Sequence, residues 1–419
     1  QVRLSSVIMT SIPTPRSLSE ITQAWVEEVV LQGQSVHTLD SVDLTREVDL
    51  RVNLRVAKME VTLTSCPNDR ITWTCKTLAD PVEPSNLLTK TNNMEKEAEF
   101  YNRLYPEIEK YLGAANLRTE NLLSPPVFAA FDGRWGIVIL KDLVAHGYEP
   151  GERGKYLNYS QAKVALETLA RFHAVSHFHK KMLNNNYGSS YTCVHKPLTN
   201  DTRLQGLNEV LDMVKTVLQG VEGLRPIARL LSAVTSNITP YRECHHRLRQ
   251  VVGPLSFVTH GDLKPENFLF LKNNGKFVEC ALRNWYYVSE MSPLVDLMTF
   301  MLLNLQAVVR KNHFSELLEF YFDHLQKYVK LLSGETIPYP HDQFLLHCRY
   351  YALPALYITV YYYADIYCHD LHNLRTTDTV VKQFVRSVTN KSKNFITPEF
   401  RDRVVGLFTH LQTLKMLPT

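Results

Sequence analysis

Residues 257–270, FVTHGDLKPENFLF, contain side chains whose types and spacing could carry out phosphoryl transfer. Asp262 follows a short apolar run, and Asn267 comes five residues after it. In such a loop an Asp can orient the attacking hydroxyl of a substrate, and an Asn can hold a metal ion. An ordinary exposed turn is the alternative interpretation, because Asp, Lys, Pro and Asn are also common turn residues.

The N-terminal third of the chain has patterns that predict strands. Apolar and polar residues alternate over residues 48–56, which predicts one half-buried strand. Residues 58–65 are predicted to continue it or pair with it, and residues 69–78 to form a third strand that carries Lys76. Residues 92–108 have a helical pattern, so a helix is expected beside this sheet.

Helical patterns surround this region and dominate the rest of the chain. Residues 17–31 predict a helix with a serine cap, and residues 160–179 predict an amphipathic helix that also starts at a serine. An apolar strand at residues 135–143 leads into an expected hinge. Long helical segments are predicted over much of 203–250 and 294–419.

These elements together predict an α+β fold with two lobes. Residues 1–145 are expected to form a small lobe with an antiparallel sheet and a helix, and residues 146–419 a larger, mainly helical lobe that carries the loop at 257–270. A chain of 419 residues is long enough for two sizeable cores.

Composition excludes several classes of partner. The net charge is +4 without long basic runs, so neither nucleic acid nor a membrane surface is expected to bind. The apolar stretch 350–364 is too short to span a bilayer and contains Pro354, and it predicts a buried helix rich in Tyr. The expected partner is a small molecule, with a protein partner or an oligomer left open.

The number and spacing of the cysteines bear on the cellular compartment of the protein. The 7 cysteines are widely spaced without a CxxC motif, which predicts neither a zinc site nor a disulfide framework. This pattern favours a reduced, cytoplasmic compartment. Two features keep secretion open: the chain starts at Gln1, and it has glycosylation sequons at Asn158, Asn200, Asn237 and Asn390.

The order of strand lysine, helix glutamate, hinge and loop resembles the kinase fold. Five segments in particular resemble the ecdysteroid-kinase-like family of arthropods, which is related to choline kinases and aminoglycoside phosphotransferases. They are EAEFYNRLYPEI, IVILKDLVAHGY, LARFHAVS, FVTHGDLKPENFLF and MSPLVDLMTFML, and they occur in the order typical of that family. The resemblance covers roughly residues 60–310.

The resemblance implies a role for each candidate side chain. Asp262 would accept or orient the proton of a substrate hydroxyl, and His260 would brace the loop. Lys76 would pair with the α- and β-phosphates of a nucleotide, and Glu97 would be its partner from the helix. The alternative is that Lys76 and Glu97 are a surface lysine and a solvated helix residue, which are common.

One expected carboxylate is missing. The family has Asp-Phe-Gln eight residues before a Ser-Pro-x-x-Asp segment, which corresponds here to Ser292–Asp296. Residues 284–286 therefore replace that triplet with Asn, Trp and Tyr, and no Asp occurs between Asp262 and Asp296. The nearby Glu279 and Glu290 do not fit the register.

This replacement predicts a weakened metal site made by Asn267 and Asn284. An Asn carbonyl can ligate Mg²⁺ but carries no charge, and Mg²⁺ prefers carboxylates together with phosphates. Arg283, beside Asn284, would add a positive charge unless its side chain points away.

Two further departures from the family pattern also predict weaker binding of a nucleotide. A loop that covers phosphates normally needs Gly, yet no Gly occurs between Gln34 and Lys76. The region instead contains Asp40, Asp43 and Glu47, which would repel a triphosphate. Lys141 stands where the family usually has Glu at the hinge.

The sequence thus supports two hypotheses of function. The first is a non-catalytic or weakly active kinase-fold protein that binds a small apolar or hydroxylated organic ligand. The second is an active small-molecule O-phosphotransferase that uses ATP and Mg²⁺, with Asp262 as base. The aromatic residues of the C-terminal half suit an apolar ligand with hydroxyl groups, although most are expected to be helix core.

Overall fold

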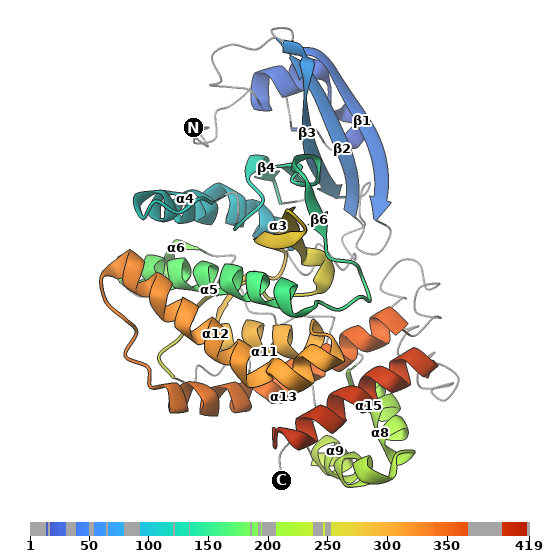
Figure 1. Ribbon diagram of the computed structural model, residues 1–419. Helices are drawn as coiled ribbons and strands as arrows, with labels where there is room; N and C mark the ends of the chain where they lie inside the picture. The colour runs from blue at the N-terminus through green and yellow to red at the C-terminus, as the bar shows by residue number, and fades with distance from the viewer. Residues whose placement is uncertain are drawn as a thin grey trace.

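The computed structural model shows a sheet at one end of the molecule and helices at the other (Figure 1). It describes residues 14–15, 17–30, 39–49, 54–63, 66–78, 93–119, 122–133, 135–184, 187–191, 194, 207–237, 246–247, 253–367 and 396–416. The described N-terminus lies near the sheet and the C-terminus near the far helices (Figure 1). The architecture is α+β with two lobes, as the sequence predicts.

Within the described residues, the N-terminal sheet has five strands, and neighbouring strands are antiparallel. Their order across the sheet is β1-β2-β3-β5-β4. The strands are β1 (Leu39–Asp49), β2 (Leu54–Leu63), β3 (Cys66–Leu78), β4 (Pro126–Phe131) and β5 (Gly136–Lys141). Strand β4 was not predicted from the sequence, because its residues, PVFAAF, lack an alternating pattern.

The alternation of side chains along β3 decides where Lys76 points. One face of the sheet packs in a small core that contains Trp73 and Cys75 of β3 together with Trp25 from the N-terminal segment. Successive side chains of a strand point to opposite faces. Lys76 therefore points to the other face, where it meets Glu97 of helix α3 (Asn93–Glu99).

The prediction of one strand over residues 48–56 is wrong. Asp49 ends β1 and Leu54 starts β2, and these two residues are paired across an antiparallel hairpin. Alternation has the same period on both sides of a hairpin connection, so the pattern did not reveal the reversal of the chain. Residues 50–53 lie outside the described part of the structure.

The predicted helix over residues 17–31 is interrupted. It consists of a 3₁₀ turn η1 (Leu18–Glu20), a helix α1 (Gln23–Trp25) and a π-helical segment η2 (Val26–Val30). Thr22, rather than a serine, accepts the capping hydrogen bond, from the N–H of Trp25 at 3.2 Å. Leu18 and Ile21 are buried against the sheet, and this packing holds Ile21 in an extended conformation between the two helical pieces.

A continuous helical segment separates the third and fourth strands. It runs from α3 through the π-helical turn η3 (Phe100–Leu104) into α4 (Tyr105–Ala114), which confirms the helix predicted over 92–108 and extends it. Phe100, Tyr101 and Ile108 are fully buried. They belong to a core that continues into the helical lobe, so the two lobes share packed side chains.

The helical lobe contains α5 (Tyr159–Met182), α6 (Tyr187–Ser190), α8 (Leu207–Gln219), α9 (Arg225–Asn237), α11 (Pro293–Leu303), α12 (Ala307–Ser333), α13 (His341–Tyr367) and α15 (Pro398–Thr413). Asn158 caps α5 through a capping box with Gln161, so the predicted serine cap at Ser160 is wrong. Helix α11 is buried along its whole length.

Helix α13 includes the tyrosine-rich stretch that was predicted to be a buried helix. Tyr351, Tyr357 and Tyr363 are almost fully buried, and Pro354 lies within the helix. Across the described part of the chain, no helix combines the length and apolar character needed to span a membrane.

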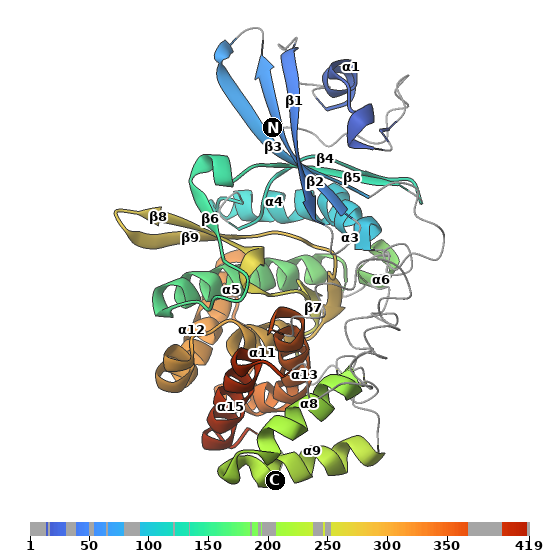
Figure 2. The ribbon, with the colours of Figure 1, turned by 90° about the vertical axis from the view of Figure 1, so that its right-hand side faces the viewer.

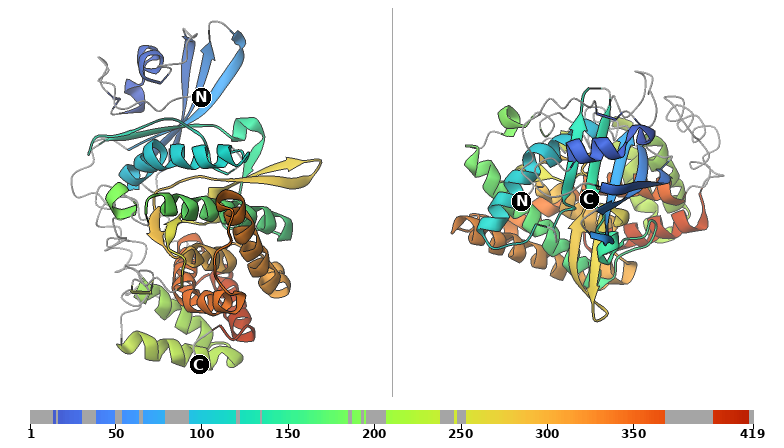
Figure 3. Two further views of the ribbon diagram at one scale, coloured as in Figure 1. Left: turned by 90° about the vertical axis from the view of Figure 1, so that its left-hand side faces the viewer. Right: turned by 90° about the horizontal axis from the view of Figure 1, so that it is seen from above.

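Short strands of the helical lobe support the candidate loop. Strands β6 (Tyr148–Pro150), β8 (Phe268–Asn273) and β9 (Lys276–Leu282) form one sheet, and β7 (Phe257–Thr259) pairs with β10 (Ser289–Met291). The β8–β9 hairpin projects from the body of the molecule (Figures 2 and 3). The loop at 260–267 connects β7 to β8, and residues 283–288 connect β9 to β10. Because β7 pairs with β10 and β8 pairs with β9, these two connecting segments lie side by side.

Candidate functional site

The second residue of the loop after β7 is a glycine whose backbone no other residue fits well. Gly261 has φ +77°, and a Cβ atom there would lie 2.5 Å from the backbone oxygen of Tyr287. This close approach brings the segment after β9 against the loop. The chain then forms a short 3₁₀ turn, η7 (Pro265–Asn267), before β8.

Gly261→Ala is expected to lower the free energy of unfolding by about 2–5 kcal/mol. A left-handed backbone costs a non-glycine residue about 1–2 kcal/mol, and the contact with Tyr287 adds a packing strain of about 1–3 kcal/mol. Gly275→Ala is the matched control, because Gly275 has φ +76° and a Cβ added there would have nothing within 4 Å. Urea denaturation should show the larger loss for Gly261→Ala, and equal losses would contradict the role of the contact.

Asp296, in the first turn of α11, holds the loop in place. Its carboxylate accepts the backbone N–H of His260 at 2.6 Å and that of Gly261 at 3.0 Å. His173, fully buried on α5, lies 3.3 Å from the same carboxylate through Nε2. Buried backbone groups need such partners, and Asp296 provides them for two N–H groups at the start of the loop.

The side chain of His260 joins the loop to the segment after β9. Its Nε2 donates to the backbone oxygen of Arg283 at 2.9 Å, and its Nδ1 accepts the N–H of Asp262 at 3.2 Å. Burial lowers the pKa of His260, so the ring is neutral and has the tautomer that these two bonds require. The structure therefore places His260 where it braces the loop.

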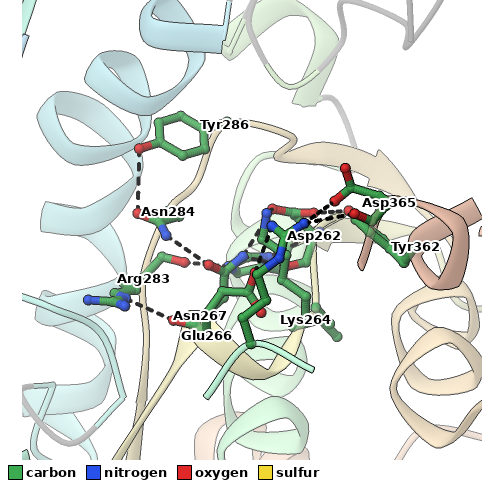
Figure 4. Close-up of polar contacts among 12 residues, drawn as sticks. Asp262, Lys264, Glu266, Asn267, Arg283, Asn284, Tyr286, Tyr362 and Asp365 are labelled. Carbon is green, nitrogen blue, oxygen red and sulfur yellow. Dashed lines mark hydrogen bonds and ion pairs between the residues drawn. The ribbon is translucent and has the colours of Figure 1, made fainter. Parts of the chain in front are cut away.

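Asp262 is 2% exposed and has contacts from three sides. The Asn267 amide donates to its backbone oxygen at 2.6 Å and to its Oδ2 at 3.0 Å. The ammonium of Lys264 lies 3.3 Å from the same Oδ2. The hydroxyl of Tyr362, from helix α13, donates to Oδ1 (Figure 4).

Lys76 and Glu97 form a buried ion pair between the sheet and helix α3. The distance between Lys76 Nζ and Glu97 Oε1 is 2.8 Å, and the side chains are 5% and 0% exposed. Burial lowers the pKa of Lys76, an effect that Glu97 opposes. The alternative of a surface lysine and a solvated glutamate is wrong for this pair.

Asn284 connects the Lys76–Glu97 ion pair to the loop that carries Asn267 and Asp262. Its Oδ1 accepts from Lys76 Nζ at 2.7 Å, and its Nδ2 donates to Asn267 Oδ1 at 2.7 Å. The residue has φ +68°, a left-handed conformation that Asn adopts more readily than most residues. A chain of hydrogen bonds thus runs from Glu97 through Lys76, Asn284 and Asn267 to Asp262.

The side chains in this series of hydrogen bonds do not offer a site for a divalent cation in their observed arrangement. Asn284 Oδ1 is occupied by the ammonium of Lys76, and Asn267 Oδ1 is occupied by the amide of Asn284. Neither residue brings a negative charge, which Mg²⁺ prefers in its ligands. Among the described residues, no group of three or more His, Cys, Asp and Glu side chains could hold a metal ion.

The residues around Asn284 have partners of their own. Trp285 is fully buried and stacks on Phe100, with ring centroids 4.1 Å apart. Arg283 points toward Glu266, and its Nε donates to the backbone oxygen of that residue at 3.0 Å (Figure 4). Besides burial, the charge of Arg283 lowers the pKa of Lys76. Burial lowers the pKa of Arg283.

The two acidic residues closest in sequence to Asn284 pair with residues outside the site. Glu279 pairs with Arg118 at 2.8 Å, and Glu290 pairs with Lys180 at 2.5 Å. Lys141 at the hinge and Asp43 on β1 are exposed. The side chains of Asp40 and Glu47 lie outside the described part of the structure.

The structure brings all six candidate side chains together and adds others that the sequence did not single out. Tyr362 and Asp365 from α13, and Arg153 from the segment before α5, lie around the loop. The tyrosine-rich pattern of α13 was visible in the sequence, but nothing in it distinguishes Tyr362 from the neighbouring core tyrosines.

A sheet lobe with a buried Lys–Glu pair, set against a helical lobe with an Asp–Asn loop, defines the kinase-like phosphotransferase fold. The comparison with protein families agrees. The chain belongs to the ecdysteroid kinase-like family, whose model matches residues 50–334. No curated protein matches the chain.

Solved structures similar to this chain include aminoglycoside phosphotransferases. An aminoglycoside phosphotransferase APH(2")-IIIa complex with GDP and kanamycin has 12% identity and a TM-score of 0.38, and the match covers 90% of this chain and 100% of that one. A putative aminoglycoside phosphotransferase from Ralstonia eutropha has 11% identity and a TM-score of 0.40, with 93% and 97% covered. The enzyme APH(3'')-Id from Streptomyces rimosus, in complex with ADP and streptomycin, has 11% identity and a TM-score of 0.34, with 81% and 99% covered.

Proposed function

We propose that this chain is a degenerate member of the ecdysteroid kinase-like family. In this proposal it binds a small apolar or hydroxylated molecule and transfers phosphate weakly or not at all. The single observation that supports it is the position of Asn284. A neutral amide stands where the family has a carboxylate, and it spans Lys76 and Asn267 by hydrogen bonds of 2.7 Å each.

The electrostatics of this arrangement disfavour a bound Mg²⁺. The oxygen that would ligate the ion already faces the positive charge of Lys76. A cation at the same oxygen would have to displace Lys76 from Asn284 and separate Asn267 from Asn284. A carboxylate would offset those losses through its charge, whereas an amide has only a dipole to offer.

Active phosphoryl transfer is the second candidate, and one observation favours it. The Lys76–Glu97 ion pair and the contact between Asp262 and Asn267 are both intact. An active enzyme would use Asp262 to orient a hydroxyl and Lys76 to bind phosphates, with Asn267 and Asn284 as neutral metal ligands. Its cofactors would be ATP and Mg²⁺.

The proposed partner is a small molecule. The mild net charge of +4 gives no support for nucleic acid or a membrane surface as a partner.

The proposed location is the cytoplasm. Among the described residues, Cys75, Cys280 and Cys348 are buried and form no disulfide, which is in keeping with a reducing compartment.

A thermal-shift titration with MgATP tests the proposal. The melting temperature is expected to stay constant up to millimolar MgATP. A ligand that binds only the native state at about 100 times its Kd would add about 2.7 kcal/mol of stability and shift the transition clearly. Such a shift, together with ATP-dependent phosphorylation of an ecdysteroid, would contradict the proposal and support the active enzyme.

A further inference from the structure

Tyr362 of helix α13 places a hydroxyl group against the central carboxylate of the loop. The hydroxyl donates to Asp262 Oδ1, while the other oxygen, Oδ2, is contacted from within the loop by Asn267 and Lys264 (Figure 4). Tyr362 is 6% exposed and Asp262 is 2% exposed. An oxygen-bound proton therefore points at Asp262 in a place that is closed to solvent.

This contact has the chemistry of a bound alcohol. A substrate hydroxyl in such a loop donates its proton toward the carboxylate of the Asp. The phenol of Tyr362 makes the same kind of bond to the same group. We propose that Tyr362 occupies the position of a ligand hydroxyl and that a hydroxylated ligand reaches Asp262 only by displacing it. The proposal rests on the ligand-binding function proposed above, and it makes Tyr362 the residue that decides which hydroxyl groups bind.

Neighbouring contacts fasten α13 to the loop and keep Tyr362 in place. Asp365, three residues after Tyr362 and so on the same face of the helix, pairs with Arg153 at 2.7 Å. The other terminal nitrogen of Arg153 lies 3.9 Å from Glu266 in the loop. Lys264 lies 5.9 Å above the Tyr362 ring as well as 3.3 Å from Asp262. The helix thus contacts the loop directly at Asp262 and is linked to Glu266 through Arg153.

These contacts define the kind of ligand that could compete. Water or a small alcohol could replace the hydroxyl but not the ring, and would leave the buried apolar volume unfilled. A ligand with an apolar or aromatic body and a hydroxyl group could replace both. The ligand class that this position selects is therefore a ring-bearing alcohol or phenol.

Removal of the Tyr362 ring tests the proposal without nucleotide or Mg²⁺. Phenol should raise the melting temperature of Tyr362→Ala, because its hydroxyl can replace that of Tyr362 at Asp262. Toluene has a similar ring without the hydroxyl, and it is expected to bind at least about tenfold more weakly. Equal effects of phenol and toluene would overturn the proposal, since the position would then be merely apolar.

Tyr363→Ala is the matched control on the same helix. Tyr363 is also buried, but its hydroxyl donates to the backbone oxygen of Leu302, at 3.4 Å, and not to the loop. Phenol should show a much smaller advantage over toluene there, because a neutral carbonyl accepts a weaker hydrogen bond than a carboxylate. An equal advantage at both positions would contradict a special role of Asp262.

Tyr362→Phe provides a second test in case the alanine variant does not fold. It keeps the ring and removes only the hydroxyl. Crystals of this variant soaked in ethylene glycol should show a water or alcohol oxygen within hydrogen-bond distance of Asp262 Oδ1. Closure of the position without such an oxygen would overturn the proposal. Either result is independent of nucleotide binding, so failure here would leave the proposed loss of MgATP chemistry untouched.

Discussion

Asn284→Asp is expected to tighten the binding of MgATP by at least about tenfold, equivalent to about 1.4 kcal/mol. The new carboxylate would still accept from Lys76, but it could no longer donate to Asn267 Oδ1, which would become available to a metal ion. The added charge is the kind of ligand that Mg²⁺ prefers. The backbone should tolerate the change, because Asp also adopts the left-handed conformation at φ +68°. Thermal-shift titrations with ATP in Mg²⁺ and in EDTA would measure the effect.

Asn274→Asp is the control for this substitution. Asn274 lies at the tip of the β8–β9 hairpin, has φ +50° and is exposed, so the same chemical change occurs there away from the site. Its variant should bind MgATP no better than the unmodified chain. Equal binding by the Asn284→Asp variant and the unmodified chain, in Mg²⁺ and in EDTA, would show that the missing charge is not what limits the site. ATP-dependent transfer to an ecdysteroid by the Asn284→Asp variant would be the strongest support.

Lys76→Met is expected to lower the free energy of unfolding by about 3–5 kcal/mol, the cost of leaving one member of a buried ion pair without its partner. Glu97 is 0% exposed, and its Oε1 would lose the ammonium at 2.8 Å. Asn284 would lose the donor to its Oδ1 at the same time. Urea denaturation of the variant would measure this loss, with or without any ligand.

Two variants test whether the unpaired charge is the cause. In Lys76→Met/Glu97→Gln the buried charge is absent, so the double variant should be more stable than Lys76→Met alone. Lys58→Met removes a lysine from the same sheet that pairs with Glu60 at 2.9 Å but is 45% exposed, and it should change stability little. Similar losses for Lys58→Met and Lys76→Met would refute the importance of burial.

Several features of the site could be predicted from the sequence because they depend on residues close together in the chain. The spacing of Asp262 and Asn267 after a short apolar run predicted one loop that carries both side chains, and the structure has this loop between β7 and β8. Strand alternation placed Lys76 in a strand, and helical periodicity placed Glu97 in a helix. Counting from Ser292 predicted that Asn284 stands where the family has a carboxylate, and this assignment remains a prediction.

Other features depend on contacts between distant segments. The same alternation runs through β1 and β2, so only the pairing of Asp49 with Leu54 revealed a hairpin. Asn284 was expected to be a poor metal ligand, but its bridge between Lys76 and Asn267 joins segments from both lobes. Tyr362 lies 100 residues after Asp262 and looks like any other tyrosine of its helix.

The sequence by itself therefore determined the family and the types of most elements around the site, and it predicted the loss of one carboxylate. Only the tertiary structure decided what the neutral amide does in its place and which hydroxyl faces Asp262. The physical reason is that periodicity and spacing reflect local backbone geometry, whereas hydrogen bonds between buried side chains depend on how whole elements pack.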